Sequence, residues 1–154
     1  MARAVSKRVK LNLAALDQLQ FAVAVGMERL ALEIVEEAAP KAPDSTGRGT
    51  IAKTGGHVVL NGSRKVGGTA SKPRSFDTRR RGIISAVAGF GSPLAHLHER
   101  GTVGRTQDES GRFTGVLPPR PFLLPATTHV VKSMGPVIGA AIKEAGFSKP
   151  GGAA

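Results

Sequence analysis

Two runs of sequence decide the fold of this chain: Leu94-Ala95-His96-Leu97-His98-Glu99-Arg100-Gly101-Thr102 and Leu117-Pro118-Pro119-Arg120-Pro121-Phe122-Leu123-Leu124-Pro125-Ala126. The second run places four prolines within eight positions. Because proline fixes φ and lacks a backbone N–H, most of this run is excluded from helix interiors and central strands. Its apolar residues should nevertheless be buried. The simplest interpretation is a rigid extended segment that anchors Phe122 in the core and leads into a helix, with Pro125 in the first turn.

Upstream of these runs, residues 12–39 are predicted to form one long helix. Asn12 is a suitable N-cap, and Pro40 and Pro43 end the pattern. Apolar side chains recur at steps of three and four residues, which is typical of an amphipathic helix. We expect this stripe to cover a sheet of the same chain, with part of it left to contact another subunit. Its members are Leu16, Leu19, Val23, Met27, Leu30, Ile34 and Ala38.

The acidic residues of this helix are unusual because they lie near its C-terminal end. Glu33, Glu36 and Glu37 occupy the last turns, where the helix dipole disfavours negative charge. Arg29 can pair with Glu33 at i,i+4, whereas Glu36 and Glu37 lack such a partner. We therefore expect a basic side chain outside the helix to contact at least one of the three, which makes them candidate interface residues.

The remaining pattern predicts a small antiparallel sheet and a second helix. Residues 57–60 indicate a short strand, followed by the turn signal Asn61-Gly62, and residues 82–91 give the clearest strand. Residues 113–117 suggest an edge strand. A helix is predicted over residues 125–145, with a kink or break at Gly135-Pro136. The predicted fold class is α+β, with the long N-terminal helix and the C-terminal helix packed on the sheet.

Positive charge is concentrated between residues 41 and 81, which hold ten Lys and Arg against two acids in a chain of net charge +11. Residues 44–82 are rich in Gly, Ser and basic residues, and we expect a mobile hairpin or loop there. This segment either serves as a solubilising surface or contacts an acidic protein partner or phosphate. In the second case the contact would order the segment. The candidate contact residues are Arg64, Lys65, Lys72, Arg74, Arg79, Arg80 and Arg81.

Composition limits the other classes of function. The 154 residues fit one domain, with a basic arm at 1–11, a domain at 12–146 and a flexible tail at 147–154. There is no Cys, so disulfides and thiolate chemistry are excluded. No apolar run has the length of a membrane span or a signal peptide. We expect a soluble protein that is intracellular when made.

The sequence shows no signature of an enzyme or a cofactor site. Phosphate-binding and dinucleotide-binding loops and a nucleophile elbow are all missing. His96-x-His98-Glu99 invites a metal interpretation, but i and i+2 point to different faces of a helix. A structural role fits better: Glu99 can bond backbone or Arg100, and Gly101 can take a positive φ that turns the chain. We expect no enzyme, no metal and no cofactor.

Three blocks of this sequence resemble the tail-component neck family of long-tailed double-stranded DNA phages. They are the Ala42-Pro43-Asp44-Ser45-Thr46-Gly47 segment after the long helix, Glu99-Arg100-Gly101-Thr102, and the Pro-x-Pro-Phe-Leu-x-Pro-Ala run at 119–126. They fall in the family's order and span most of the chain. In place of the family's basic apolar strand after Thr-Gly, this chain has a longer Gly-rich basic segment.

The resemblance implies a structural virion protein at the head–tail junction, made in the host cytoplasm. Such proteins form rings of six or twelve copies around the DNA channel and contact other connector and tail proteins. Non-specific contact with virion DNA is a further expectation, and no membrane is involved. Within the same class the alternative is a tail terminator or head-closure protein. In another class it is a basic nucleic-acid-binding accessory protein. The structural motif residues would be Glu99, Gly101, Thr102, Pro121, Phe122 and Pro125.

Overall fold

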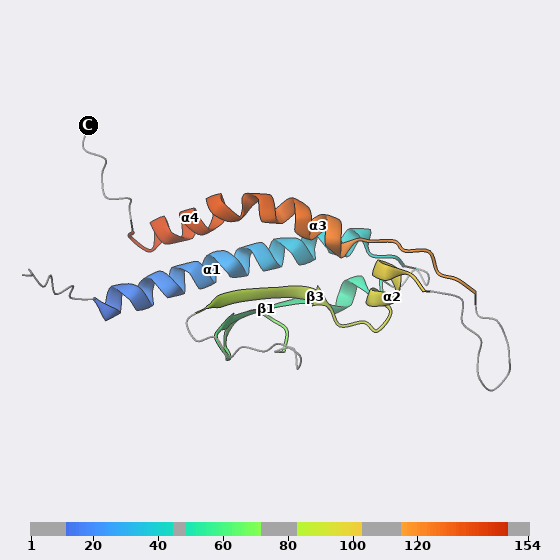
Figure 1. The fold of residues 1–154 in the computed structure, drawn as a ribbon, viewed down its shortest axis with the longest axis horizontal. Helices are drawn as coiled ribbons and strands as arrows, with labels where there is room; N and C mark the ends of the chain where they lie inside the picture. Colours follow the sequence, from blue (N-terminus) through green and yellow to red (C-terminus); the bar gives the residue numbers. More distant parts are fainter. Residues whose placement is uncertain (1–11, 45–48, 72–82, 103–114, 148–154) are drawn as a thin grey trace, which may run out of the picture.

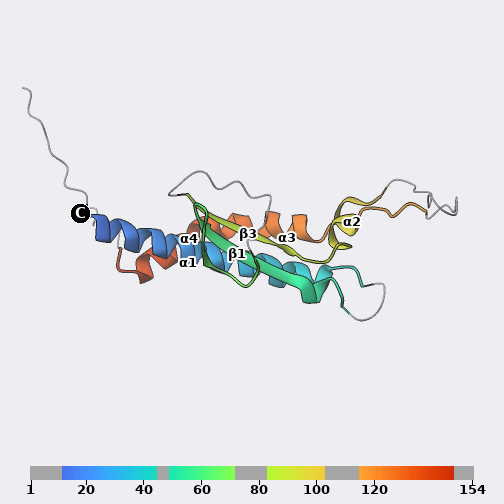
Figure 2. The ribbon, with the colours of Figure 1, turned by 90° about the horizontal axis from the view of Figure 1, so that it is seen from below.

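The computed structural model of the chain describes residues 12–44, 49–71, 83–102 and 115–147. These residues form an elongated α+β fold, as the sequence predicts. Figure 1 shows three layers, with helix α1 (Leu13–Ala38) lying between the sheet and the pair α3 (Leu123–Val130) and α4 (Met134–Glu144), and Figure 2 shows the sheet in front of the helices when the molecule is seen from below. The start of α1 and the end of α4 lie at the same end of the molecule (Figure 1).

Helix α1 begins and ends close to its predicted limits. The side chain of Asn12 accepts a hydrogen bond from the backbone N–H of Ala15 at 3.3 Å, and Pro40 lies in the short 3₁₀ turn η1 (Ala39–Lys41) that follows. The buried positions are mostly small, because α1 is packed on two sides. A Cβ on Gly26 would lie 3.0 Å from the Cα of Ile138, so α4 can approach closely only at a glycine. Buried in α1 are Ala22, Gly26, Leu30, Ala31 and Ala38.

Of the predicted stripe, Leu30 and Ala38 are fully buried, while Leu16 is 43% exposed. The other members are half-buried. The N-terminal part of the stripe therefore extends beyond the sheet, because α1 has 26 residues whereas the two longest described strands, β1 and β3, have seven each.

The sheet is antiparallel, in the order β2-β1-β3. A 3₁₀ turn, η2 (Ala52–Thr54), leads into the central strand β1 (Gly55–Asn61). Strands β2 (Arg64–Gly67) and β3 (Ile84–Phe90) lie at the edges, which confirms the strands predicted at 57–60 and 82–91. Gly62 turns the β1–β2 hairpin with φ +58°. Residues Val58, Val59 and Leu60 are at most 1% exposed, so the central strand is buried on both faces.

The C-terminal helical region departs from the prediction in two ways. It begins at Leu123, two residues early, because Pro125 is tolerated in the first turn. The predicted break at Gly135-Pro136 lies earlier, in the 3₁₀ turn η3 (Val131–Ser133), and Pro136 is the third residue of α4. At that position proline removes no intrahelical hydrogen bond.

The edge strand predicted at 113–117 is not formed in the described part, residues 115–117. There Leu117 makes a single bridge with Thr102, because the prolines that follow leave few N–H groups for a ladder.

Candidate assembly surfaces

Glu99 in the short helix α2 (Ala95–Arg100) caps the start of α3 from outside. Its carboxylate accepts the backbone N–H groups of Phe122 at 2.9 Å, Leu123 at 3.1 Å and Leu124 at 2.8 Å. These donors have no intrahelical acceptor, and the next position, Pro125, has no N–H at all. One side chain therefore satisfies the whole first turn of α3, and its negative charge also suits the helix N-terminus.

The electrostatics of Glu99 follow from these bonds. Burial of the carboxyl raises its pKa, but the backbone N–H groups of Phe122, Leu124 and Leu123 lower it by more. The pKa of Glu99 consequently lies below the ordinary value of 4.5. A carboxylate whose pKa is lowered by three backbone N–H groups fits the structural interpretation of the motif.

Gly101 and Thr102, which follow α2, also contact the segment that leads to Phe122. Gly101 has φ +72° and ψ −178°, and a Cβ there would lie 2.7 Å from the carbonyl oxygen of Leu117. Thr102 donates its backbone N–H to that oxygen at 2.8 Å and accepts the Leu117 N–H on its hydroxyl at 3.1 Å. The backbone N–H of Arg120 reaches the carbonyl of His98 at 2.7 Å. We call residues Glu99, Gly101, Thr102 and the segment 117–124 the clasp.

The clasp delivers Phe122 into the core, as the sequence predicts. Phe122 is 2% exposed and meets Phe90 edge-to-face, with ring centroids 5.2 Å apart. Pro121 stays exposed, and Pro125 occupies the third position of α3. The buried cluster around the ring joins α1, α2, α3 and the residue before η2, and comprises Ala38, Ile51, Ala95 and Ala126.

Only one of the three predicted acidic interface residues has partners in the described chain. Glu37 is bonded by Lys41 Nζ and by His129 Nδ1, each at 2.7 Å, and these hydrogen bonds, Lys41 first, hold its pKa below the ordinary value. The expectation that Glu37 lacks an i,i+4 partner is therefore wrong, because the chain continues into η1 and Lys41 stays within reach.

Glu33 and Glu36 are exposed and make no ion pair or hydrogen bond with any described residue. The predicted Arg29–Glu33 pair is absent. Arg29 instead makes a bidentate pair with Glu144 of α4, at 2.7 and 3.1 Å, because close packing of α4 on α1 presents that carboxylate. Glu33 lines a shallow hollow together with His129 and Lys132.

The predicted basic contact residues are described only in part. Arg64 and Lys65 are exposed on β2, next to Val66, which is 45% exposed. Lys65 Nζ bonds the carbonyl of Ala70 at 2.9 Å. The other basic candidates, Lys72, Arg74, Arg79, Arg80 and Arg81, lie outside the described residues, as do Ser45, Thr46 and Gly47 of the resemblance.

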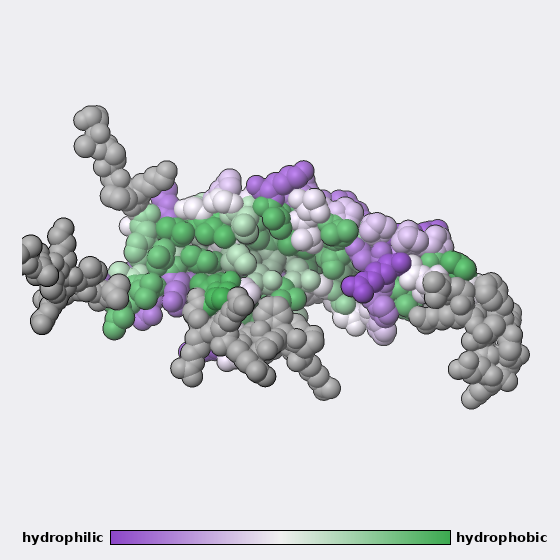
Figure 3. Space-filling model, viewed as in Figure 1, coloured by the Kyte–Doolittle hydropathy of each residue, from purple (hydrophilic) through white to green (hydrophobic). Residues whose placement is uncertain are grey.

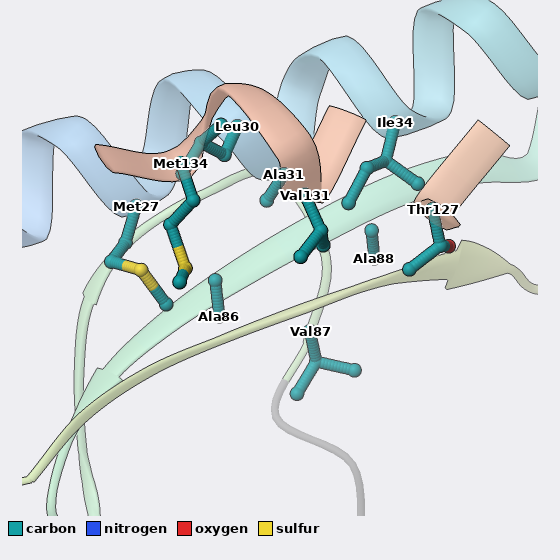
Figure 4. Close-up of a pocket in the computed structure, with 10 residues that line it drawn as sticks. All are labelled: Met27, Leu30, Ala31, Ile34, Ala86, Val87, Ala88, Thr127, Val131 and Met134. Carbon is teal, nitrogen blue, oxygen red and sulfur yellow. The ribbon is translucent and has the colours of Figure 1, made fainter. Parts of the chain in front are cut away.

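An apolar groove that sequence reasoning missed opens between α1, the edge strand β3 and the α3–η3–α4 region (Figure 4). It has a volume of about 330 Å³. The side chains of Met27 and Met134 lie together at one end, while Val87 points away from the groove (Figure 4). The feature of the sequence that hinted at this groove is the methionine in each of the two helices. Their side chains come together only because α4 packs on α1. The remaining lining residues are Leu30, Ala31, Ile34, Ala86, Ala88, Thr127 and Val131.

Further apolar side chains lie open to solvent. Phe21 is 71% exposed and Leu32 42% exposed on α1, and both face away from the buried positions of that helix. Figure 3 shows apolar residues in a band along the molecule, above the sheet. A helix that is apolar on more than one side is typical of a helix packed in a larger assembly.

Among the described residues, no group of three or more His, Cys, Asp or Glu side chains could hold a metal ion. His57 is buried beside Glu28, with Nε2 3.6 Å from the carboxylate, and Glu28 also accepts the backbone N–H of Gly68 at 2.8 Å. Within the described ranges no helix has the length and apolar character needed to cross a membrane.

Comparison of the chain with family models, curated proteins and solved structures finds no match.

Proposed function

We propose that this chain is a structural protein of a phage neck. It forms a ring at the head–tail junction that joins or completes the tail around the DNA channel. It acts by assembly rather than catalysis, and its partners are further copies of itself and other connector and tail proteins.

The observation that carries this proposal is the unpartnered apolar surface. Phe21 and Leu32 are exposed on a helix whose other sides already contact the sheet and α4, and the groove at Met27 and Met134 adds a second apolar area. Single exposed apolar residues are normal on a monomer, but two areas of this kind on one small domain favour association.

The clasp adds support through the resemblance. Glu99 and Thr102 bond the backbone of the segment that carries Phe122, which gives a physical reason for the Glu-x-Gly-Thr and Pro-x-Pro-Phe-Leu blocks to occur together. The clasp accounts for the two blocks as parts of one hydrogen-bonded connection that positions Phe122. The proposal of a ring depends instead on the exposed apolar surfaces.

The test is the mass and shape of the purified protein in solution. Light scattering after size exclusion, over a wide range of protein concentration, should give a closed oligomer, and negative-stain electron microscopy should show rings of six or twelve copies. A protein that remains monomeric at every concentration, both alone and mixed with isolated phage connectors, would contradict the proposal.

Two alternatives make different predictions. A tail terminator would bind isolated tails, and a head-closure protein would bind filled heads, so a pull-down with each particle separates them from a connector ring.

A basic nucleic-acid-binding accessory protein is favoured only by the net charge of +11 and the exposed Arg64 and Lys65. It would bind duplex DNA as a monomer, with an affinity that falls steeply with salt.

A further inference from the structure

Two oppositely charged patches on this chain are separated along α1. The acidic patch consists of Leu32, Glu33 and Glu36, which lie at i, i+1 and i+4 on the exposed side of the C-terminal half of α1. The basic patch consists of Arg64, Lys65 and Val66, all exposed on the edge strand β2. Each patch combines charge with one exposed apolar side chain, Leu32 at 42% and Val66 at 45%.

The two patches do not meet within one molecule. Asn61, the register partner of Arg64, bonds Gln20 of α1 at 3.1 Å, which places Arg64 beside the N-terminal half of that helix, whereas Gly68, just after β2, bonds Glu28 at 2.8 Å. Glu33 lies thirteen residues after Gln20 along α1, so its level is about 20 Å from that of Arg64, and neither Arg64 nor Lys65 forms an ion pair with Glu33 or Glu36. Such a distance is beyond an ion pair and exceeds the screening length at physiological salt.

Of the described bases close to the acidic patch, Arg29 and Lys41 are already paired, whereas Lys132 lines the hollow beside Glu33 without forming an ion pair with it. Arg29 holds Glu144 with both of its terminal nitrogens, and Lys41 holds Glu37. Helix α1 carries no basic residue in its last turn, so Glu33 and Glu36 stand unneutralised against the helix dipole. The chain has a net charge of +11, so this exposed negative surface is opposite in sign to the molecule as a whole.

We propose that the acidic patch of one copy binds the basic patch of the next copy, so that Glu33 and Glu36 face Arg64 and Lys65 across the subunit boundary and Leu32 packs near Val66. This inference rests on the proposed ring and names the contact that builds it. The two surfaces differ, so the contact is heterologous, and repeating it gives a ring when the rotation closes. Opposite charges fix the register of such a contact and speed its formation.

The absence of native cysteine makes this contact directly testable. Two single-cysteine proteins, E36C and R64C, are mixed under assembly conditions and treated with a short bismaleimide cross-linker. A covalent dimer is expected in the mixture and not with either protein alone, because each copy then offers a different surface. The matched control pairs R64C with K143C, which changes an exposed residue of α4 outside both patches and should give no dimer.

Charge reversal gives a second readout. The E33K/E36K and R64E/K65E proteins should each self-associate about tenfold more weakly, and an equimolar mixture of the two should recover mixed assemblies, because both contacts between the two variants again join patches of opposite charge. Circular dichroism confirms that each variant is folded.

The outcomes distinguish a failure of this contact from a failure of the proposed ring. Rings that form without the E36C–R64C cross-link, and that persist in the reversal variants, overturn this contact and leave the proposed ring standing. A cross-link with E36C alone would show an isologous contact and also overturn it. Loss of DNA binding by R64E/K65E with no change in self-association would assign the basic patch to nucleic acid instead. A protein that is monomeric throughout overturns both the contact and the ring.

Discussion

Glu99 binds the backbone of Phe122, because its carboxylate Oε2 accepts the Phe122 N–H at 2.9 Å across 23 positions of sequence. The same side chain binds the next two N–H groups, so it fixes both the entry of the proline-rich segment and the start of α3. The stability of the fold and the position of the Phe122 ring therefore both depend on the hydrogen bonds between Glu99 and the start of α3.

Replacing Glu99 tests this connection. Glu99→Ala should lower the free energy of unfolding by about 2–3 kcal/mol, because three N–H groups lose a charged acceptor. Glu99→Gln, which keeps one carbonyl oxygen, should cost less. Urea denaturation at pH 7 measures both, and Arg100→Ala, at the exposed neighbouring position, is the control. An unfolding midpoint of Glu99→Ala equal to that of the parent would contradict the cap.

The pH dependence of this effect has a definite sign. The pKa of Glu99 is lowered in the folded state, so the stability it contributes is present above the unfolded value of about 4.5 and is lost as pH falls through the folded value. The difference between the parent and Glu99→Gln should therefore be constant near neutrality and shrink below pH 4.5. Repeated denaturation between pH 3 and 7 (a range set about that value) checks it, and a difference that grows with acid would refute the assignment.

Phe122→Ala should destabilise the protein by about 3–5 kcal/mol, because a ring that is 2% exposed leaves a cavity beside Phe90. Phe122→Leu should lose less, since it refills part of that volume. Thermal unfolding compares the two, and Phe21→Ala on the exposed face of α1 is the matched control. An unchanged melting temperature for Phe122→Ala would reject the anchor.

Gly101→Ala should cost about 1–3 kcal/mol from backbone strain alone, because φ +72° with ψ −178° is a region reserved for glycine. The added Cβ would also press on the Leu117 carbonyl. Gly139→Ala is the control, since nothing lies within 4 Å of a Cβ in that position of α4, and it should gain up to about 1 kcal/mol of stability. Equal behaviour of the two variants would rule out the strained turn.

Phe21→Ser tests the exposed apolar surface. The side chain is 71% exposed, so the change should alter the free energy of unfolding of the monomer by no more than about 0.5 kcal/mol. Self-association measured by sedimentation should weaken, because the proposed ring would cover this residue. Asp17→Ser, at an exposed polar position of the same helix, is the control. Undiminished assembly of Phe21→Ser would exclude Phe21 from the subunit contact.

Local chemistry allowed several elements to be predicted from the sequence. Asn12 and Pro40 mark the limits of α1 because capping and proline geometry act within one turn. Strand β3 follows from a run of apolar and β-branched residues, and Gly101 takes the positive φ expected of it. The burial of Phe122 was predicted because a large ring in a rigid segment has few other ways to leave water.

Tertiary structure alone decided which groups meet. Arg29 pairs with Glu144 rather than Glu33, and Glu99 reaches the start of α3 rather than Arg100, because packing α4 and α2 against distant segments presents acceptors that spacing cannot reveal. The groove at Met27 and Met134 likewise exists only once α4 lies on α1 at Gly26. Helix limits depend on neighbours in sequence, whereas ion pairs and grooves depend on neighbours in space.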